Sequence, residues 1–211
     1  MTKNKTIAIF GATGKVGSEF VNMALQDGYS LRVLIRRKKS FKAIDDNRIE
    51  VFEGDVTNPE HVENVIVGAD IVVSVLGNTH RNVLIMENAT ENIFRAATAQ
   101  SNPPRCLMIS SVGVGGSSWL IKAMLTLIGG AATFADYESA EARVRNEKQV
   151  PFLVIRPYAL TDKPATGKYK IIPGDTAHFA KPIARADVAQ FFLESVADSS
   201  RDGTSVNIGA A

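Results

Sequence analysis

The sequence predicts an α/β protein, with one doubly wound, mostly parallel sheet flanked by helices. Two observations support this fold class. Short runs rich in Val, Ile and Leu alternate along the chain with segments of helical length and period. The apolar runs are continuous rather than alternating, which is typical of strands covered on both faces. A regular succession of strand and helix favours parallel strands joined by right-handed crossovers.

The length and composition fit one domain of this class. The chain has 211 residues, of which 45% are hydrophobic and 22% charged, with a formal net charge of +2. A chain of this length buries enough surface to fold without a disulfide or a structural metal. Its single cysteine, Cys106, excludes a disulfide within the chain, and the balanced charge argues against general nucleic-acid binding. We therefore expect one domain over residues 1–211.

The elements can be assigned in order. The predicted strands are bounded by Gly, Pro, Asn or Asp and cover residues 6–10, 31–35, 49–52, 70–76, 105–110 and 152–155. The predicted helices between them cover residues 15–26, 59–67, 83–100 and 137–148. Gly28 is expected to end the first helix, and Thr57 with Glu60 forms a candidate capping box for the second.

The chain after Arg156 has a looser pattern. Prolines, glycines and alternating polar residues predict loops and short strands, and residues 157–182 form the expected small substrate-side region. A last helix at 185–198 and a last strand at 205–208 complete the domain.

Neither a signal peptide nor a membrane span is evident. The longest apolar segment, residues 119–128, is interrupted by polar residues, and a span needs about 20 residues. It is expected to be a core or pocket-covering helix, with a dimer face as an alternative. The glycines before it, Gly113, Gly115 and Gly116, either hinge a lid or only turn the chain. We expect a cytoplasmic monomer or homodimer.

A glycine-rich loop follows the first strand and opens the first helix. Its spacing is G-x-x-G-x-x-G, which suits a tight turn, close approach to a pyrophosphate and packing of the helix on the sheet. The helix N-terminus then offers N–H groups to phosphates. The residues expected at the phosphates are Gly11, Thr13, Gly14, Lys15, Val16 and Gly17. The alternative is a strand-to-helix turn without a ligand.

The end of the second strand predicts which dinucleotide binds. An acidic residue there would hold the ribose 2′-hydroxyl of NAD, but this chain has Arg36, Arg37, Lys38 and Lys39. Basic side chains attract a 2′-phosphate, and Arg can hold it bidentately. The expected cofactor is therefore NADP(H), with Arg36 and Arg37 at the phosphate. A solvated basic loop is the alternative.

The third and fourth strands end in further candidates. Asp55 and Val56 are placed to meet the adenine, with the Asp55 carboxylate accepting from its exocyclic amine. Asp55 could instead only begin the next helix. Leu76 and Gly77 close the fourth strand, where a small residue leaves room for ribose and phosphates.

Several motifs together resemble the short-chain dehydrogenase/reductase superfamily. They lie at residues 7–14, 28–29, 33–36, 54–56, 110–111 and 166–169. The chain looks most like the atypical, NmrA-like NAD(P)H-binding branch and is similar to its biliverdin-IXβ reductase/flavin reductase family. The resemblance implies a Rossmann-type NAD(P)-binding oxidoreductase. It places Ser110 and Ser111 facing the nicotinamide and substrate, and Pro157 beside the cofactor.

The catalytic pattern departs from that superfamily. Tyr137 is the best-placed tyrosine, but Glu141 stands four residues later, where familiar members have lysine. A carboxylate on the same helix face raises a tyrosine pKa, so Tyr137 is expected to act as a neutral hydrogen-bond donor and not as a base. Ser111 and Tyr137 are the catalytic candidates. Ala159 replaces the histidine of the biliverdin pattern, which argues against biliverdin as substrate.

Three functions remain open from the sequence. The favoured one is an NADPH-dependent reductase whose small-molecule acceptor is planar and conjugated, such as a flavin or quinone, because such acceptors take their proton from solvent. The others are a non-catalytic NADP(H) sensor that docks a protein, and an epimerase or dehydratase. No metal is expected, since His61, His80 and His178 are scattered and are predicted to lie at the surface.

Overall fold

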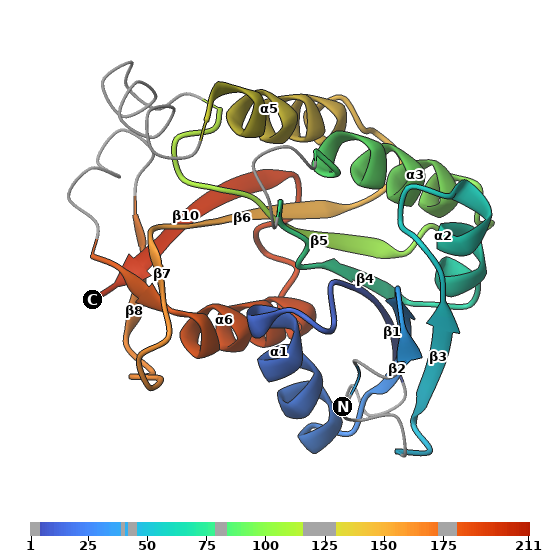
Figure 1. The fold of residues 1–211 in the computed structure, drawn as a ribbon, viewed down its shortest axis with the longest axis horizontal. Coiled ribbons are helices and arrows are strands. Elements are labelled where there is room, and N and C mark those ends of the chain that lie inside the picture. The colour runs from blue at the N-terminus through green and yellow to red at the C-terminus, as the bar shows by residue number, and fades with distance from the viewer. Residues whose placement is uncertain (1–4, 39–40, 42–45, 79–83, 116–129, 173–180) are drawn as a thin grey trace.

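The computed structural model describes residues 5–38, 41, 46–78, 84–115, 130–172 and 181–211. An eight-stranded sheet lies at the centre of these residues (Figure 1). Its strands are β1 (Thr6–Phe10), β2 (Ser30–Ile35), β3 (Ile49–Glu53), β4 (Ile71–Ser74), β5 (Arg105–Ile109), β6 (Phe152–Pro157), β8 (Tyr169–Ile172) and β10 (Thr204–Ala210). The order is β3-β2-β1-β4-β5-β6-β10-β8. Neighbours pair in parallel apart from β8, which runs antiparallel to β10. The predicted mostly parallel sheet is confirmed.

Helices cover both faces of the sheet. Figure 1 shows α1 (Lys15–Gln26) and α6 (Arg185–Ala197) together on one face. The other face carries α2 (Pro59–Ile66), α3 (Met86–Thr98) and α5 (Ala131–Arg145). Strands β7 (Leu160–Thr161) and β9 (Ile183–Ala184) pair in parallel outside the main sheet. β7 lies in the region 157–182 that was predicted as loops and short strands, and β9 follows directly after it. The fold is the doubly wound α/β domain that the sequence predicts.

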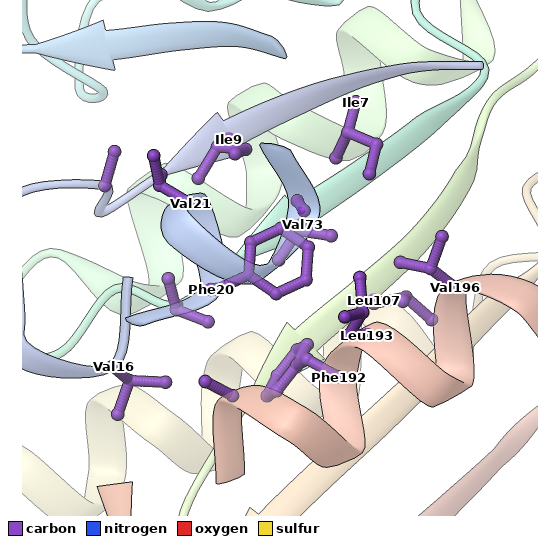
Figure 2. Packing of buried hydrophobic residues seen from close by; sticks show 14 of the residues in the cluster. Ile7, Ile9, Val16, Phe20, Val21, Val73, Leu107, Phe192, Leu193 and Val196 are labelled. Atoms are coloured by element: carbon purple, nitrogen blue, oxygen red, sulfur yellow. The ribbon is translucent and has the colours of Figure 1, made fainter. Parts of the chain in front are cut away.

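The core divides into two apolar clusters because side chains alternate across each strand. In β1, Ile7 and Ile9 join the cluster under α1 and α6, while Ala8 and Phe10 join the cluster under the other three helices. Figure 2 shows the first cluster, where side chains of β1, β4 and β5 meet those of α1 and α6. Burying each large apolar side chain contributes about 2 kcal/mol.

The chain reverses direction across the sheet between β1 and β4. It builds β1, β2 and β3 outward to one edge and then returns to place β4 on the other side of β1. In open α/β sheets, ligands bind in the crevice that this reversal leaves at the carboxyl ends of the strands. The glycine-rich loop after β1, the basic residues after β2 and the loops after β3 and β4 therefore meet at one end of the sheet.

Some predicted boundaries are wrong. Asn58, not Thr57, caps α2, and its side chain accepts from the Glu60 N–H. The helix predicted to begin at Tyr137 begins at Ala131. Gly28 does end α1, with a φ of 87° that favours glycine.

Other expectations concern positions that the structure does not describe. The apolar segment 119–128 lies outside the described ranges. Four single residues named above also lie outside them: Lys39, His80, Gly116 and His178. In the part of the chain that is described, no helix combines the length and hydropathy that crossing a membrane requires.

Candidate functional site

A cleft opens at the carboxyl ends of β1 to β4. Eight of the residues predicted to hold a cofactor line it: Gly11, Thr13, Gly14, Arg36, Asp55, Val56, Leu76 and Gly77. Its remaining lining residues are Phe10, Leu34, Ile35, Gly54, Val75 and Ile85. Most of these remaining residues are apolar and lie at or near the ends of strands. The strand pattern of the sequence is the signal that could have identified them as lining residues. Among the described residues, the cleft therefore joins apolar walls to a glycine loop, the cation of Arg36 and the carboxylate of Asp55.

The glycines of the loop are required by close packing. Gly11 has a φ of 94°, and a Cβ there would lie 2.8 Å from the Val75 carbonyl oxygen. A Cβ on Gly17 would lie 2.1 Å from the Gly11 carbonyl oxygen. Side chains at either position would push the loop away from β4 or lift α1 off the loop. Gly17 thus serves helix packing and does not line the cleft.

The N-terminus of α1 faces the cleft without a protein cap. Its N-cap is Gly14, which makes no side-chain capping bond among the described residues, and its first turn carries no acidic residue. The first N–H groups of a helix need acceptors, and the helix dipole favours a negative charge there. This end of α1 fits a phosphate group.

The side chains of two residues predicted at the phosphates, Lys15 and Val16, do not line the cleft. The Lys15 ammonium pairs with Asp162 at 2.6 Å, and Arg185 pairs with the same carboxylate at 2.5 Å. Val16 places its side chain in the apolar cluster beneath α1. Neither side chain lines the cleft, so Val16 can offer only its backbone there.

The lining of the cleft includes a cation and an anion that interact electrostatically, Arg36 and Asp55. Arg36 and Arg37 are both exposed just beyond β2, and Arg36 lines the cleft. Hydrogen bonds from Thr57, first from its backbone and then from its hydroxyl, lower the pKa of Asp55, and the charge of Arg36 adds to this effect. Asp55 is therefore a carboxylate at neutral pH, ready to accept a hydrogen bond.

A histidine accepts a hydrogen bond from the loop after β3. His61, on α2, was predicted to lie at the surface, but it is half-buried and its Nδ1 accepts from the Asp55 N–H at 3.0 Å. Asn92, a buried residue of α3, donates to the Val56 carbonyl at 3.0 Å. Sequence reasoning missed both contacts because they depend on how α2 and α3 pack.

Tyr137 reaches the end of β4. A Cβ added to Gly77 would lie 3.4 Å from the Tyr137 hydroxyl oxygen. Burial raises the pKa of Tyr137, the neighbouring Asp136 carboxylate adds to the rise, and a hydrogen bond with the Asn78 backbone opposes it. The direction matches the prediction, but the cause differs: Glu141 is not responsible, because its carboxylate pairs elsewhere.

That carboxylate organises the ends of β5 and β6. Glu141 is fully buried and accepts from the Ser110 hydroxyl, from Arg156 at 2.8 Å and from Arg145 at 3.2 Å. Gly115 packs against this cluster so closely that a Cβ would lie 2.4 Å from the Arg156 guanidinium. The buried cluster ties α5 to both strands.

The predicted residues of this second region do not line the cleft. The Ser110 hydroxyl, expected to face cofactor and substrate, instead donates to Glu141. Ser111, half-buried, donates to the Val112 carbonyl at 3.1 Å. Pro157 is buried at the end of β6. The described residues thus form a cleft at the carboxyl ends of β1 to β4 and a separate buried polar cluster.

The sequence matches a known protein family along most of its length. The sequence model of the NAD(P)H-binding family matches residues 11–199. The ceramide reductase of Caulobacter vibrioides is 37% identical over 109 residues, which are 50% of this chain and 34% of that protein. An uncharacterized chloroplastic protein of Arabidopsis thaliana is 25% identical over 217 residues, covering 92% of this chain and 72% of that one. The match thus spans about a third of the ceramide reductase.

Solved structures share the fold. ChuY, an anaerobillin reductase of Escherichia coli O157:H7, superposes with a TM-score of 0.81 at 21% identity, over 98% of this chain and 97% of that one. A short-chain dehydrogenase/reductase of Veillonella parvula, in complex with NADP, has a TM-score of 0.80 at 21% identity, over 97% and 94%. At such identities the likeness concerns the fold alone.

Proposed function

Because this chain belongs to the NAD(P)H-binding family, we propose that it is an NADPH-dependent reductase acting on a planar, conjugated acceptor such as a flavin or quinone. One observation carries the cofactor assignment. The cleft joins an uncapped helix N-terminus to Arg36 at the end of β2. The first suits a pyrophosphate, and the second suits a 2′-phosphate rather than a ribose hydroxyl.

Each part of the cleft has a role in holding NADPH. Gly14 and the first N–H groups of α1 bind the pyrophosphate, while Arg36 pairs with the 2′-phosphate. Asp55 and Val56 meet the adenine. Leu76 and Gly77 lie under the ribose toward the nicotinamide. When bound, the nicotinamide supplies a hydride, and the protein orients it and excludes water.

The acceptor class follows from which side chains can move a proton. Tyr137 has a raised pKa, so it stays protonated at neutral pH and acts only as a hydrogen-bond donor. Ser111 is the second candidate donor. An acceptor that takes its proton from solvent needs no dedicated acid–base pair, which favours flavins and quinones over simple ketones. ChuY and the ceramide reductase are both named as reductases, which supports this reaction class.

One observation favours a second function, a non-catalytic NADP(H) sensor. The Ser110 hydroxyl donates to Glu141, and the Ser111 hydroxyl donates to a backbone carbonyl. In this conformation both serine hydroxyls therefore donate to groups of the protein itself, so Ser111 would have to give up its bond to the Val112 carbonyl to serve as a donor to an acceptor.

Two measurements on the wild-type protein separate these functions. Fluorescence titration gives the affinities for NADPH and NADH, and absorbance follows NADPH oxidation with FMN, riboflavin, a quinone and biliverdin. Tight NADPH binding with oxidation by flavin or quinone supports the reductase. Tight binding without oxidation by any acceptor favours the sensor. Failure to bind either dinucleotide contradicts both.

A further inference from the structure

We infer that His61 sets the base specificity of the cleft by fixing the backbone of Asp55 and Val56 in a conformation that selects adenine. The inference rests on the proposed binding of NADPH. His61 itself does not line the cleft, so it acts as a positioning residue through Asp55.

The imidazole of His61 makes one well-defined contact with the loop. The Asp55 N–H donates to Nδ1 at 3.0 Å. A neutral imidazole that accepts at Nδ1 carries its proton on Nε2, so this bond also fixes the tautomer. The ring lies so close to the loop that a Cβ on Gly54 would be 2.7 Å from its Cγ and Nδ1. Gly54 is thus the residue that lets the imidazole reach the backbone.

Three further hydrogen bonds, two from Thr57 and one from Asn92, fix the groups on either side of that bond. The Thr57 N–H and hydroxyl both donate to Oδ1 of Asp55, at 2.8 and 2.7 Å. The Asn92 side chain on α3 donates to the Val56 carbonyl. Among the described residues, Oδ2 of Asp55 and the Val56 N–H have no hydrogen-bond partner. The loop therefore presents one acceptor beside one donor.

That pairing matches the hydrogen-bonding edge of adenine. Adenine donates from its exocyclic amine and accepts at the adjacent ring nitrogen. Hypoxanthine has the opposite order, with a carbonyl oxygen and a ring N–H. A carboxylate facing that carbonyl would be repelled, and the Val56 N–H would face another donor. A rigid loop thus distinguishes the two bases, because a mismatched base leaves polar groups unpaired.

Loss of the imidazole would release the peptide before Asp55. Its N–H would have no acceptor, and the peptide would be free to turn toward water. The carboxylate and the Val56 N–H would then no longer keep a fixed spacing. We expect a loss of discrimination between bases that exceeds the loss of affinity.

The test compares the binding of NADPH and its hypoxanthine analogue by fluorescence titration. Wild-type protein should prefer NADPH by about tenfold or more. His61→Leu should reduce that preference to about twofold, since the acceptor is gone. His61→Asn should restore it, because its Oδ1 can take the place of Nδ1. Glu63→Leu, an exposed change on α2, controls for adding an apolar side chain to that helix.

The outcomes separate the inference from the proposed function. If wild-type protein binds neither nucleotide, the cofactor proposal fails. If it binds NADPH but shows no preference, or if His61→Leu keeps the full preference, the role of His61 is overturned. Should His61→Leu not fold, His61→Gln replaces it, since its oxygen corresponds to Nε2 and does not reach the Asp55 N–H. Equal preferences of His61→Gln and His61→Asn would then overturn the inference.

Discussion

The proposed preference for NADPH over NADH depends on the side chain of Arg36. It lines the cleft at the end of β2, where the charge of Arg36 also helps to lower the pKa of Asp55. Arg36→Ala should weaken NADPH binding by about 10- to 100-fold, because a charge-assisted bidentate contact is lost. NADH binding should stay within about twofold, since it has no 2′-phosphate. Fluorescence titration measures both affinities.

The control for Arg36→Ala removes a positive charge from a distant surface. Lys170 is exposed on β8, at the opposite edge of the sheet from β3. Lys170→Ala should leave both affinities unchanged at moderate ionic strength, because salt screens distant surface charges. An equal loss of NADPH and NADH binding in Arg36→Ala would show that Arg36 supports the cleft without contacting the phosphate.

Eight of the cleft residues were predictable from the sequence, but the residues that support them were not. Gly14, Arg36 and Asp55 each follow an apolar strand, and parallel topology brings such positions to one edge. His61 and Ser110 find their partners through the packing of helices on the sheet, which no local pattern encodes. Ser110 was expected at the cofactor from the family resemblance, and the sequence does not reveal that Glu141 turns inward to accept from its hydroxyl.

Helices α3 and α5 are joined by hydrogen bonds from the N-terminus of α3 to a side chain of α5. Asp136 on α5 is buried and accepts from the N–H groups of Met86 and Glu87, at 3.0 and 2.9 Å, and from the Asn78 side chain at 2.8 Å. The N-cap of α3, Ile85, makes no side-chain cap bond among the described residues. Asp136 thus caps α3 from a neighbouring helix.

Removing this cap should destabilise the protein measurably. Asp136→Ala is expected to lower the free energy of unfolding by about 1–3 kcal/mol, because buried donors lose their acceptor. Asp136→Asn keeps one oxygen acceptor and should cost less. Urea unfolding gives both values, and an unchanged midpoint for Asp136→Ala would contradict the capping role.

The Glu141–Arg156 pair is the second link between elements. Glu141→Ala should lower the free energy of unfolding by about 3–5 kcal/mol, because it leaves the buried Arg156 charge uncompensated. Arg156→Ala should lower the free energy of unfolding by a similar amount, because it removes the guanidinium that pairs with the buried Glu141 carboxylate. The double variant should lose less than the sum of the two single losses, as expected for residues in direct contact. Strictly additive losses in urea unfolding would exclude a direct coupling.

The buried carboxylates of α5 also explain why the start of this helix was predicted wrongly. The buried face of α5 includes Asp136 and Glu141 beside Ala140 and Val144. Carboxylates on a buried face erase the apolar period by which an amphipathic helix is recognised. The N-cap is Gly130, which offers no side-chain capping signal. The strands were predicted more closely because their apolar runs are continuous.

At the scale of the whole molecule, acid should destabilise the fold. Five described carboxyls have lowered pKa values: Asp46, Asp55, Glu147, Asp162 and Asp198. The largest cause of the lowered pKa is a hydrogen bond from the Thr57 backbone at Asp55, from the Lys15 side chain at Asp162 and from the Ser200 backbone at Asp198. A lowered pKa adds stability that is complete above the ordinary carboxyl pKa of about 3.9 and is lost as pH falls through the folded value. The melting temperature should therefore fall steeply below about pH 4.

A single substitution checks the source of this pH dependence. Asp162→Asn removes one of the titrating groups together with its pairing to Lys15 and Arg185. Its melting temperature should fall less than that of the wild type between neutral and acid solution. An identical acid response in both proteins would show that Asp162 does not contribute to it.

The position of β10 has a consequence for biosynthesis. This strand lies between β6 and β8, although the ribosome makes it after both. The parallel strands β1 to β6 can assemble as they emerge, whereas β8 waits for its antiparallel partner. Until then Ile171, which is 42% exposed even in the finished fold, lies on an unpaired edge. Substitutions that weaken β10 should therefore lower the yield of folded protein through aggregation during synthesis, while molecules that do fold keep their cleft intact.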